Sequence, residues 1–336
     1  MVRELTEAVR ITEQNWGDDS RPVVSVFNWS FNHVKFIRQS IESILEQKTT
    51  FPVEIIIHDD ASADGTQEII REYETRYPRL FRNIIQKENQ WSQGNSVMDP
   101  MIRAPRGKYI ALTHGDDCWA DPFKLQKQVE YLEDNPDCVL SCHDACTIDQ
   151  HDQVTADSRL RPEEKRDLTR EELAQGGYVL TLTMCFRNCI REFPPEMKSS
   201  PNGDLFLCVM LSEFGSCHFH SDIQPAKYRM HEDGVWSLRP QQMRWENAIA
   251  TYAQLIPYLK RCNRARLKDF YVRFSLEKQE SLFIHYLLHG KSKEWLRLLL
   301  SQIAFAFTYT SFLAGIRKTA RLVRITVNQR KQRRVR

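Results

Sequence analysis

The chain has 336 residues, of which 41% are hydrophobic and 27% are charged, as in a globular protein with a sizeable core. This length exceeds what one compact domain usually needs and is short for three. The 47 basic and 44 acidic residues nearly balance, but residues 317–336 carry nine basic residues and no acid. The body is therefore mildly acidic, which argues against a protein built mainly to bind nucleic acid.

The N-terminus and the cysteines both favour a cytosolic protein. Residues 1–16 carry charges throughout and lack the apolar core of a secretory signal. The nine cysteines do not have the spacing of a small secreted domain, so we expect reduced thiols. A zinc site is a weaker alternative, because the candidate ligands lack a CxxC pair; they are Cys138, Cys142, His143 and Cys146.

Strands and helices are predicted to alternate over the first 150 residues. Buried strands are expected at 22–28, 53–58, 81–86, 108–113 and 138–142. Helices are expected at 33–47, 66–77 and 121–134. This alternation predicts an α/β fold in which helices cover both faces of a mostly parallel sheet.

The pattern loosens after residue 150. Residues 151–175 are polar and charged, and 178–187 predict another buried strand. A helix is expected at 204–214, and residues 241–290 have helical periodicity. We therefore expect four parts: an extension at 1–21, an α/β domain at 22–240, a helical region at 241–297, and a C-terminal segment at 298–336.

Two acidic pairs follow predicted strands, Asp59 with Asp60 and Asp116 with Asp117. Ligands of parallel sheets gather at the carboxyl ends of the strands, so the two pairs are expected to meet at one edge. Like charges at one site call for a bound cation, a shifted pKa or a donor from a ligand. A divalent cation with oxygen ligands, Mg²⁺ or Mn²⁺, fits best.

Two motifs resemble the nucleotide-sugar motifs of inverting GT-A-fold glycosyltransferases of family 2. They are HDDASADGT at 58–66 and HGDDCWADPFKLQKQVEYL at 114–132. The resemblance covers about residues 22–240, with NGDLFL at 202–207 and YRMHEDGVWS at 228–237. It is greatest to non-processive bacterial enzymes of surface-polysaccharide assembly. It implies a Rossmann-like GT-A sheet and sugar transfer from a nucleotide-diphosphate donor, UDP favoured, to a glycan or lipid-linked acceptor.

The resemblance also implies roles for the four acids of the two motifs. Asp60 would hydrogen-bond the nucleotide base, and Asp64 would shape that loop or contact the ribose. Asp116 would bind the metal and link it to the diphosphate. Asp117 would lie beside it and face the donor sugar.

Three further residues are placed by the later motifs. Asp204 falls at the position of the general base, and an N-cap role is the alternative; Glu213 is the reserve candidate. His231 falls where a histidine near the pyrophosphate or metal is common. Arg229 is expected to pair with phosphate, with a surface salt bridge as the alternative.

The sequence departs from the family pattern at two positions. His114 stands where relatives commonly have an acid, and Asp233 where a glycine is frequent. Both departures bear on donor preference and on the metal role of His231. Trp119 and Trp236 are expected either to stack on sugar rings or to lie in the core.

A nucleotidyltransferase and a nucleic-acid-binding protein remain open as other functions, and a processive synthase is disfavoured. A metal-dependent nucleotidyltransferase also uses paired aspartates, but it is expected to have a Gly-rich basic loop after the first strand, where this chain has NWSFNH. QQMRW at 241–245 has the spacing of processive synthases, but the multi-span membrane region of those enzymes is missing. A nucleic-acid-binding protein that uses the basic tail is the alternative from another class.

Residues 298–316 form a run of 19 residues without a charge. Its small and polar residues fall three and four apart, which favours an interfacial helix over a full span. With the basic tail on anionic headgroups, we expect a cytoplasmic protein held peripherally on the inner face of the membrane. A buried helix followed by a disordered tail is the alternative.

Deletion of residues 298–336 should release the protein from membranes, because the uncharged segment and the basic tail are both lost. Fractionation of cell lysates would measure this. An insoluble truncated product would instead show that the segment belongs to the core.

Overall fold

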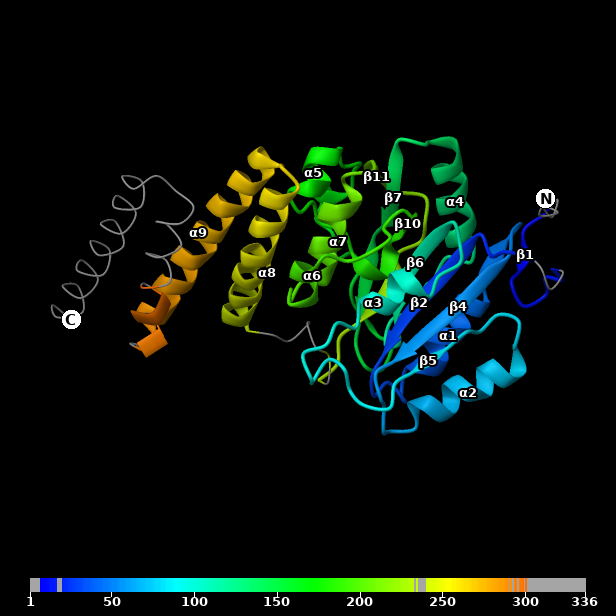
Figure 1. Cartoon of the computed structure of the whole chain (residues 1–336). Coiled ribbons are helices and arrows are strands. Elements are labelled where there is room, and N and C mark those ends of the chain that lie inside the picture. Colours follow the sequence, from blue (N-terminus) through cyan, green and yellow to red (C-terminus); the bar gives the residue numbers. More distant parts are fainter. Residues whose placement is uncertain are drawn as a thin grey trace. The chain divides into compact units, whose positions relative to one another are not determined.

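The computed structural model describes residues 7–16, 20–232, 234, 240–289, 291, 293–294, 296–298 and 300 (Figure 1). The chain divides into two compact units. The first consists of Met1–Lys198 and Gly203–Leu238, and the second of Ser199–Asn202 and Arg239–Arg336.

A seven-stranded sheet forms the centre of the first unit (Figure 1). Its order is β11-β7-β10-β6-β2-β4-β5, and β10 alone runs antiparallel to its neighbours in that sheet. The strands are β2 Val24–Ser30, β4 Val53–Asp59, β5 Ile84–Ile85, β6 Tyr109–His114, β7 Cys138–His143, β10 Cys185–Arg187 and β11 Ser216–His220. The predicted α/β class with a mostly parallel sheet is confirmed.

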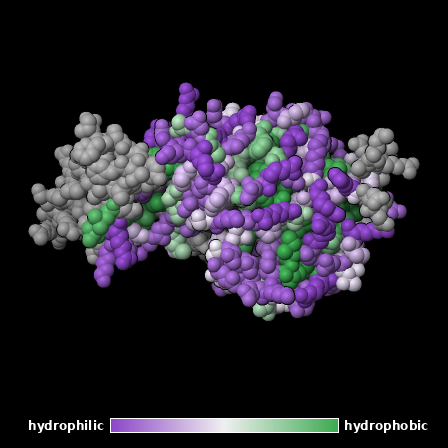
Figure 2. All heavy atoms as spheres, viewed as in Figure 1, coloured by the Kyte–Doolittle hydropathy of each residue, from purple (hydrophilic) through white to green (hydrophobic). Residues whose placement is uncertain are grey.

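Continuous apolar runs explain the central strands. All seven residues of β4 are buried, as a strand covered on both faces requires. The helix α1, Ile37–Leu45, buries Ile37, Ile41 and Ile44, which recur on one helical face. Hydrophilic residues cover most of the face shown in Figure 2, and hydrophobic residues form only limited areas of it.

The other helices of this unit connect or follow the strands. They are α2 Thr66–Arg76, α3 Asp99–Arg103, α4 Lys124–Asp134, α5 Arg170–Ala174, α6 Pro195–Lys198 and α7 Gly203–Leu211, with 3₁₀ turns η1 Pro162–Glu164 and η2 Thr181–Thr183. Two small sheets complete the unit. One pairs β1, Val9–Arg10, with β3, Lys48–Thr49, and the other joins β12 Ala226–Arg229, β8 Ala145–Ile148 and β9 Val154–Ala156 in that order.

The segment 178–187 differs from the predicted single strand. Only Cys185–Arg187 pair in the sheet, while Thr181–Thr183 form η2 and Tyr178 is exposed. The apolar residues of this stretch therefore belong to a turn as well as to a strand. This turn matters below because it lies beside Asp204.

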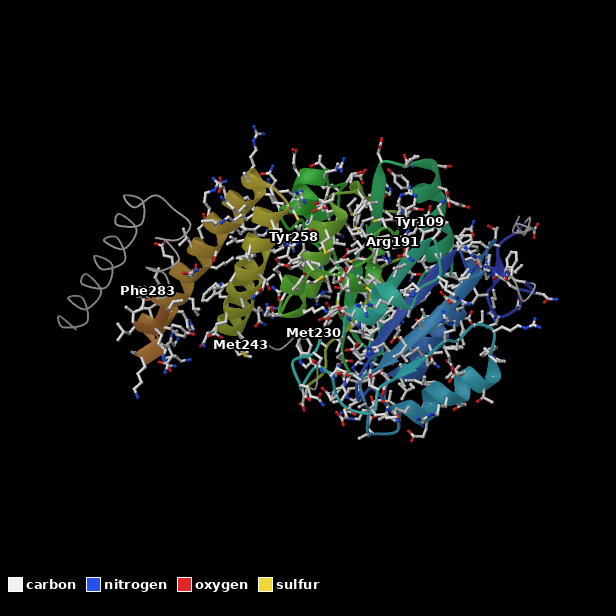
Figure 3. All side chains as sticks on the ribbon, in the orientation of Figure 1. Tyr109, Arg191, Met230, Met243, Tyr258 and Phe283 are labelled. Atoms are coloured by element: carbon white, nitrogen blue, oxygen red, sulfur yellow. The ribbon has the colours of Figure 1, made fainter. Side chains whose placement is uncertain are left out.

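The second unit contains a pair of long helices, α8 Gln241–Arg261 and α9 Ala265–Leu288. Apolar side chains from both helices are buried, among them Tyr258 of α8 and Phe283 of α9 (Figure 3). The segments 298–316 and 317–336 lie outside the described residues except for 298 and 300, and so do Asp233 and Trp236. Over the described part of the chain, no helix combines the length and apolar character needed to cross a bilayer.

Glu54 in β4 is a buried carboxylate near the amino end of the sheet. It forms ion pairs with Arg82 and Arg106. Its Oε2 accepts from Arg106 Nε at 2.9 Å and lies 3.3 Å from Arg82 NH1. Its Oε1 accepts from Ser25 Oγ at 2.6 Å and from the Arg106 backbone at 2.7 Å. A buried charge of this kind is tolerated because each oxygen is hydrogen-bonded.

Glu54→Gln should lower the free energy of unfolding by about 1.5–3 kcal/mol, because an amide replaces a charged acceptor that has five donor atoms around it, the fifth being Arg106 NH2. Chemical denaturation followed by tryptophan fluorescence would measure it. Glu72→Gln, which removes an exposed ion pair with Arg38, is the control and should change stability little. Equal effects of the two variants would contradict this role of Glu54.

Candidate active site

Parallel register brings the ends of three strands together. Ser30 of β2 pairs with Asp59 of β4, and Trp29 of β2 pairs with His114 of β6. The loops that follow these strands therefore emerge at one edge of the sheet. β12 reaches the same place, because Lys227 and Cys118 form a β-bridge just after Asp117.

His33, Asp116 and His231 form a cluster at this edge. Asp116 Oδ2 lies 3.1 Å from His231 Nε2 and 3.9 Å from His33 Nε2. One ligand atom from each residue lies within 4.8 Å of the others, and this is the metal-type cluster found among the described residues. Two imidazole nitrogens and one carboxylate oxygen are a suitable donor set for a divalent transition metal.

The sequence prediction named Asp116 and His231 but missed His33. His33 follows β2 in the loop NWSFNH, where Asn32 has a positive φ of 53°. Its ring lies against Gly115, since a Cβ at that position would be only 2.6 Å from His33 Nδ1. Gly115 thus leaves room for His33 beside the carboxylate of the next residue.

The charges around Asp116 keep it ionised. Burial raises the pKa of Asp116, but the nearby imidazoles of His33, His231 and His114 outweigh that effect, and the pKa lies well below its ordinary value. Burial lowers the pKa of His33, and the Asp116 charge offsets this only in part. An ionised carboxylate beside a neutral imidazole is the protonation state that metal binding needs.

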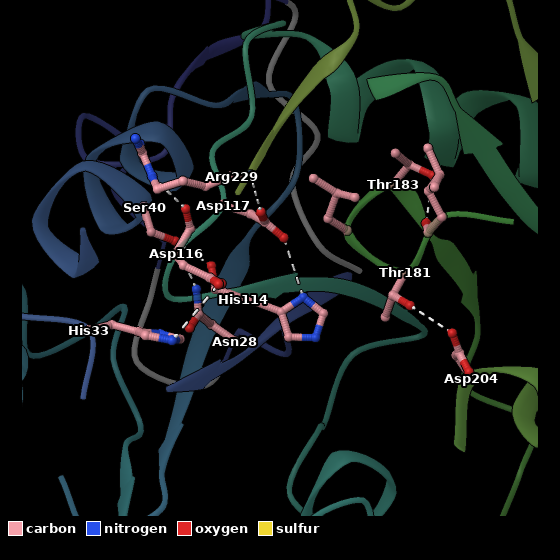
Figure 4. A network of polar contacts seen from close by, with 12 residues as sticks. Asn28, His33, Ser40, His114, Asp116, Asp117, Thr181, Thr183, Asp204 and Arg229 are labelled. Carbon is pink, nitrogen blue, oxygen red and sulfur yellow. Dashed lines mark hydrogen bonds and ion pairs between the residues drawn. The ribbon is translucent and has the colours of Figure 1, made fainter. Parts of the chain in front are cut away.

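Asp117 points into the protein. It is 3% exposed, and its Oδ1 accepts from the backbone N–H of Arg229 at 3.0 Å. Its Oδ2 lies 3.5 Å from His114 Nδ1 (Figure 4). Burial and the adjacent Asp116 charge raise the pKa of Asp117. Its contacts fix the loop that carries Asp116.

The guanidinium of Arg229 is buried within this loop region. Its Nε donates to the Asp116 carbonyl at 3.0 Å and its NH1 to the Asp149 carbonyl at 3.0 Å. Its NH2 lies 2.7 Å from Asp152 Oδ1, and the group stacks 4.7 Å above the Phe36 ring. Every guanidinium nitrogen of Arg229 thus has a partner in the chain.

Asp60 and Asp64 organise neighbouring loops. The carboxylate of Asp60 accepts from the backbone N–H groups of Gln90 and Trp91, at 2.7 and 3.0 Å. Asp64 accepts from the N–H of Val34 at 3.0 Å and from Thr66 Oγ1 at 2.6 Å. Burial raises the pKa of Asp64, but the hydrogen bonds from Thr66 and Val34 outweigh it and lower the pKa.

Asp204 is the second residue of α7 and is exposed. Its Oδ1 accepts from the N–H of Leu205 at 2.8 Å, and its Oδ2 lies 3.5 Å from Thr181 Oγ1 (Figure 4). Desolvation raises the pKa of Asp204, although the hydrogen bond from the Leu205 N–H and the positive charge of His114 oppose it. Glu213, the reserve base, lies beyond the other end of α7.

His114 and Trp119 lie around these acids. The carboxylates of Asp117, Asp116 and Asp204 outweigh desolvation and raise the pKa of His114. The indole ring of Trp29 stacks on His114 at a centroid distance of 5.3 Å. Trp119 is buried, with its Nε1 donating to the Leu182 carbonyl at 2.8 Å, as expected of a core aromatic.

Comparison with known proteins identifies the family. The description Glycosyl transferase family 2 matches residues 25–193, half of the chain. An uncharacterized protein of Mycobacterium tuberculosis is 34% identical over 218 residues, which are 63% of this chain and 60% of that protein. The chain therefore spans about 60% of the length of such curated relatives.

Two solved structures share the fold. TarS 1–349 of S. aureus in complex with UDP-GlcNAc has a TM-score of 0.61 at 15% identity, over 92% of this chain and 91% of that one. The mannosyltransferase PcManGT of Pyrobaculum calidifontis, in complex with GDP-Man and Mn²⁺, has a TM-score of 0.51 at 16% identity, over 92% and 90%. The GT-A fold predicted from the motifs is thus confirmed, and this chain belongs to glycosyltransferase family 2.

Proposed function

We propose that this enzyme transfers a sugar, with inversion, from a nucleotide-diphosphate donor to a glycan or lipid-linked acceptor in surface-polysaccharide synthesis. The observation that carries the proposal is the juxtaposition of a metal-type cluster with an exposed carboxylate of raised pKa. Asp116 lies with two imidazoles, and Asp204 lies close enough to His114 for their charges to interact. The cluster around Asp116 is suited to bind a divalent cation together with a diphosphate, and Asp204 is suited to act as a general base.

His33, Asp116 and His231 would hold the divalent cation. The buried Nδ1 atoms of both histidines make no hydrogen bond within the described structure, whereas the Nε2 atoms face Asp116. Imidazole ligands favour Mn²⁺ over Mg²⁺, which prefers oxygen. A cation bound there would neutralise the negative charge that develops on the departing diphosphate.

Asp204 would act as the general base. Its carboxylate takes the proton of the acceptor hydroxyl while the acceptor oxygen bonds to the anomeric carbon. The bond from that carbon to the diphosphate oxygen breaks, and its electron pair leaves with the nucleotide. Attack opposite the leaving group inverts the anomeric centre. The raised pKa of Asp204 improves its match to a proton transfer near neutral pH.

Asp60 and Asp64 would shape the nucleotide site, and UDP is the donor we favour. A carboxylate has about four lone-pair positions, so Asp60 can accept from the base while it holds the amides of Gln90 and Trp91. Asp64 fixes the loop after β4 through Val34 and Thr66. TarS was solved with UDP-GlcNAc and PcManGT with GDP-Man, so experiment must decide which nucleobase the donor of this chain carries.

The contacts of Asp117 and Arg229 support a role different from direct donor binding. The Asp117 carboxylate accepts from the Arg229 backbone N–H, and the Arg229 Nε donates to the Asp116 carbonyl, so both contacts hold the loop that carries Asp116. A phosphate could reach Arg229 only if a present partner were exchanged. We therefore propose that they hold Asp116 in place, and their predicted contact with the donor stays a prediction.

The motif resemblance and the C-terminal sequence are the support for the proposed acceptor and location. Peripheral attachment to the inner face of the cell membrane would bring the enzyme to a lipid-linked acceptor. That attachment rests on residues 298–336 and stays a prediction.

Gly115→Ala should weaken Mn²⁺ binding by about tenfold or more, because its Cβ would push the His33 ring away from Asp116. Electron paramagnetic resonance of free Mn²⁺, with UDP present, would measure the affinity. His33→Ala should weaken binding similarly. In the His33→Ala background the alanine at 115 should add little, since no ring remains to displace. Additive effects, or wild-type affinity in both single variants, would refute the assigned cluster.

Asp204→Asn should lower kcat by about 10²–10⁴ while Mn²⁺-dependent nucleotide-sugar binding is kept, because only the proton acceptor is lost. Nucleotide release from UDP-GlcNAc and GDP-Man would report turnover, and thermal shift would report binding. Glu213→Gln is the matched control at the far end of α7. If the two variants turn over alike, Asp204 is not the base.

A further inference from the structure

A buried lysine, Lys124, has no part in the chemistry above. It lies at the start of α4 with no exposed surface, and its Nζ donates to the neutral amide oxygen of Gln128 at 2.6 Å. The same ammonium lies 4.2 Å from the centre of the Trp119 ring. Burying an ammonium group costs free energy, so a fully buried lysine calls for a structural explanation.

The contact with Lys124 fixes which way the Gln128 amide points. An ammonium only donates, so the amide oxygen must face it and the NH₂ group must face away. That NH₂ group donates to the Ser141 carbonyl at 3.0 Å and to the Thr183 carbonyl at 2.9 Å. Gln128 is fully buried, and these two hydrogen bonds connect β7 to η2.

Trp119 donates a hydrogen bond to the same turn. Its indole N–H donates to the Leu182 carbonyl, one residue before the carbonyl that Gln128 holds. Trp119 comes three residues after Asp116, so the loop with the metal carboxylate is tied directly to η2. Thr181, the first residue of η2, meets Asp204 (Figure 4).

We propose that Trp119, Gln128 and Lys124 form a buried clamp that positions η2, and through Thr181 the Asp204 carboxylate, relative to Asp116. They are positioning residues, and this role rests on Asp204 being the base. An error of about 1 Å in the position of a reacting group can cost 10²-fold in rate. A rigid link between the metal carboxylate and the base would hold the two at a constant separation.

A matched pair of substitutions separates this role from general stability. Gln128→Met removes the hydrogen bonds of Gln128 to the Ser141 and Thr183 carbonyls and keeps a side chain of similar length. Gln47→Met is the control, because Gln47 is also buried and bridges two backbone groups, donating to the Asp121 carbonyl at 2.8 Å and accepting from the Leu125 N–H at 3.1 Å. Trp119→Phe, which removes the N–H-bearing five-membered ring of the indole and keeps a phenyl ring, is a second test if Gln128→Met folds poorly.

Two measurements on the full chain test the clamp. Amide hydrogen exchange should be faster at residues 178–190 in Gln128→Met and Trp119→Phe, and unchanged there in Gln47→Met. With Mn²⁺ and UDP-GlcNAc or GDP-Man, kcat should fall about tenfold or more in the two clamp variants, with an unchanged KM for the donor. Lys124→Met combined with Gln128→Met should lower kcat no further than Gln128→Met alone.

Exchange at 178–190 that matches the Gln47→Met control would overturn the clamp. Equal kcat values for the Gln128→Met and Gln47→Met variants, or a loss of donor binding that parallels the loss of kcat, would also overturn it. A wild-type chain inactive on both donors would count against the proposed function, whereas the exchange measurement would still decide whether the clamp exists.

Discussion

The parallel pairing of β2 with β4 and β6 is the constraint on which the site depends. In-register hydrogen bonds end these three strands at one level, so the loops that begin near residues 31, 60 and 115 emerge side by side. Residues more than 80 positions apart in sequence, such as His33 and Asp116, are thereby brought within 4 Å. The buried runs of β2 and β4 supply the apolar burial that keeps this register, because a slip of one residue would move every side chain to the other face.

The loops at that edge carry acidic residues of two kinds. Asp117, which is buried, and Asp64, which is exposed, both accept hydrogen bonds from backbone N–H groups and hold loops in place. Asp116 and Asp204 keep oxygens directed toward other groups of the site, one beside imidazoles and one with exposed surface. The same residue type therefore serves structure and chemistry, and the neighbours decide which.

The sequence was informative where a local pattern carries the structure. Apolar runs predicted the strands at 53–58 and 108–113, and the family resemblance of the motifs pointed to Asp116 and His231. His33 was missed because nothing local distinguishes it; its role depends on strand order and on the space above Gly115. The three-stranded sheet with β8, β9 and β12 was missed because short strands have too few alternations to detect. The direction of the Arg229 side chain depends on Asp116, Asp149 and Asp152, which only the fold brings together.

The central claim is that one carboxylate and two histidine side chains converge on a single divalent cation. Pulsed electron paramagnetic resonance of the Mn²⁺- and UDP-loaded protein tests it most directly, because ¹⁴N couplings report imidazole ligands. The account predicts couplings from two imidazole nitrogens, with one lost when His33 is replaced and the other when His231 is replaced. A bound Mn²⁺ with oxygen ligands only, and no nitrogen coupling, would contradict it.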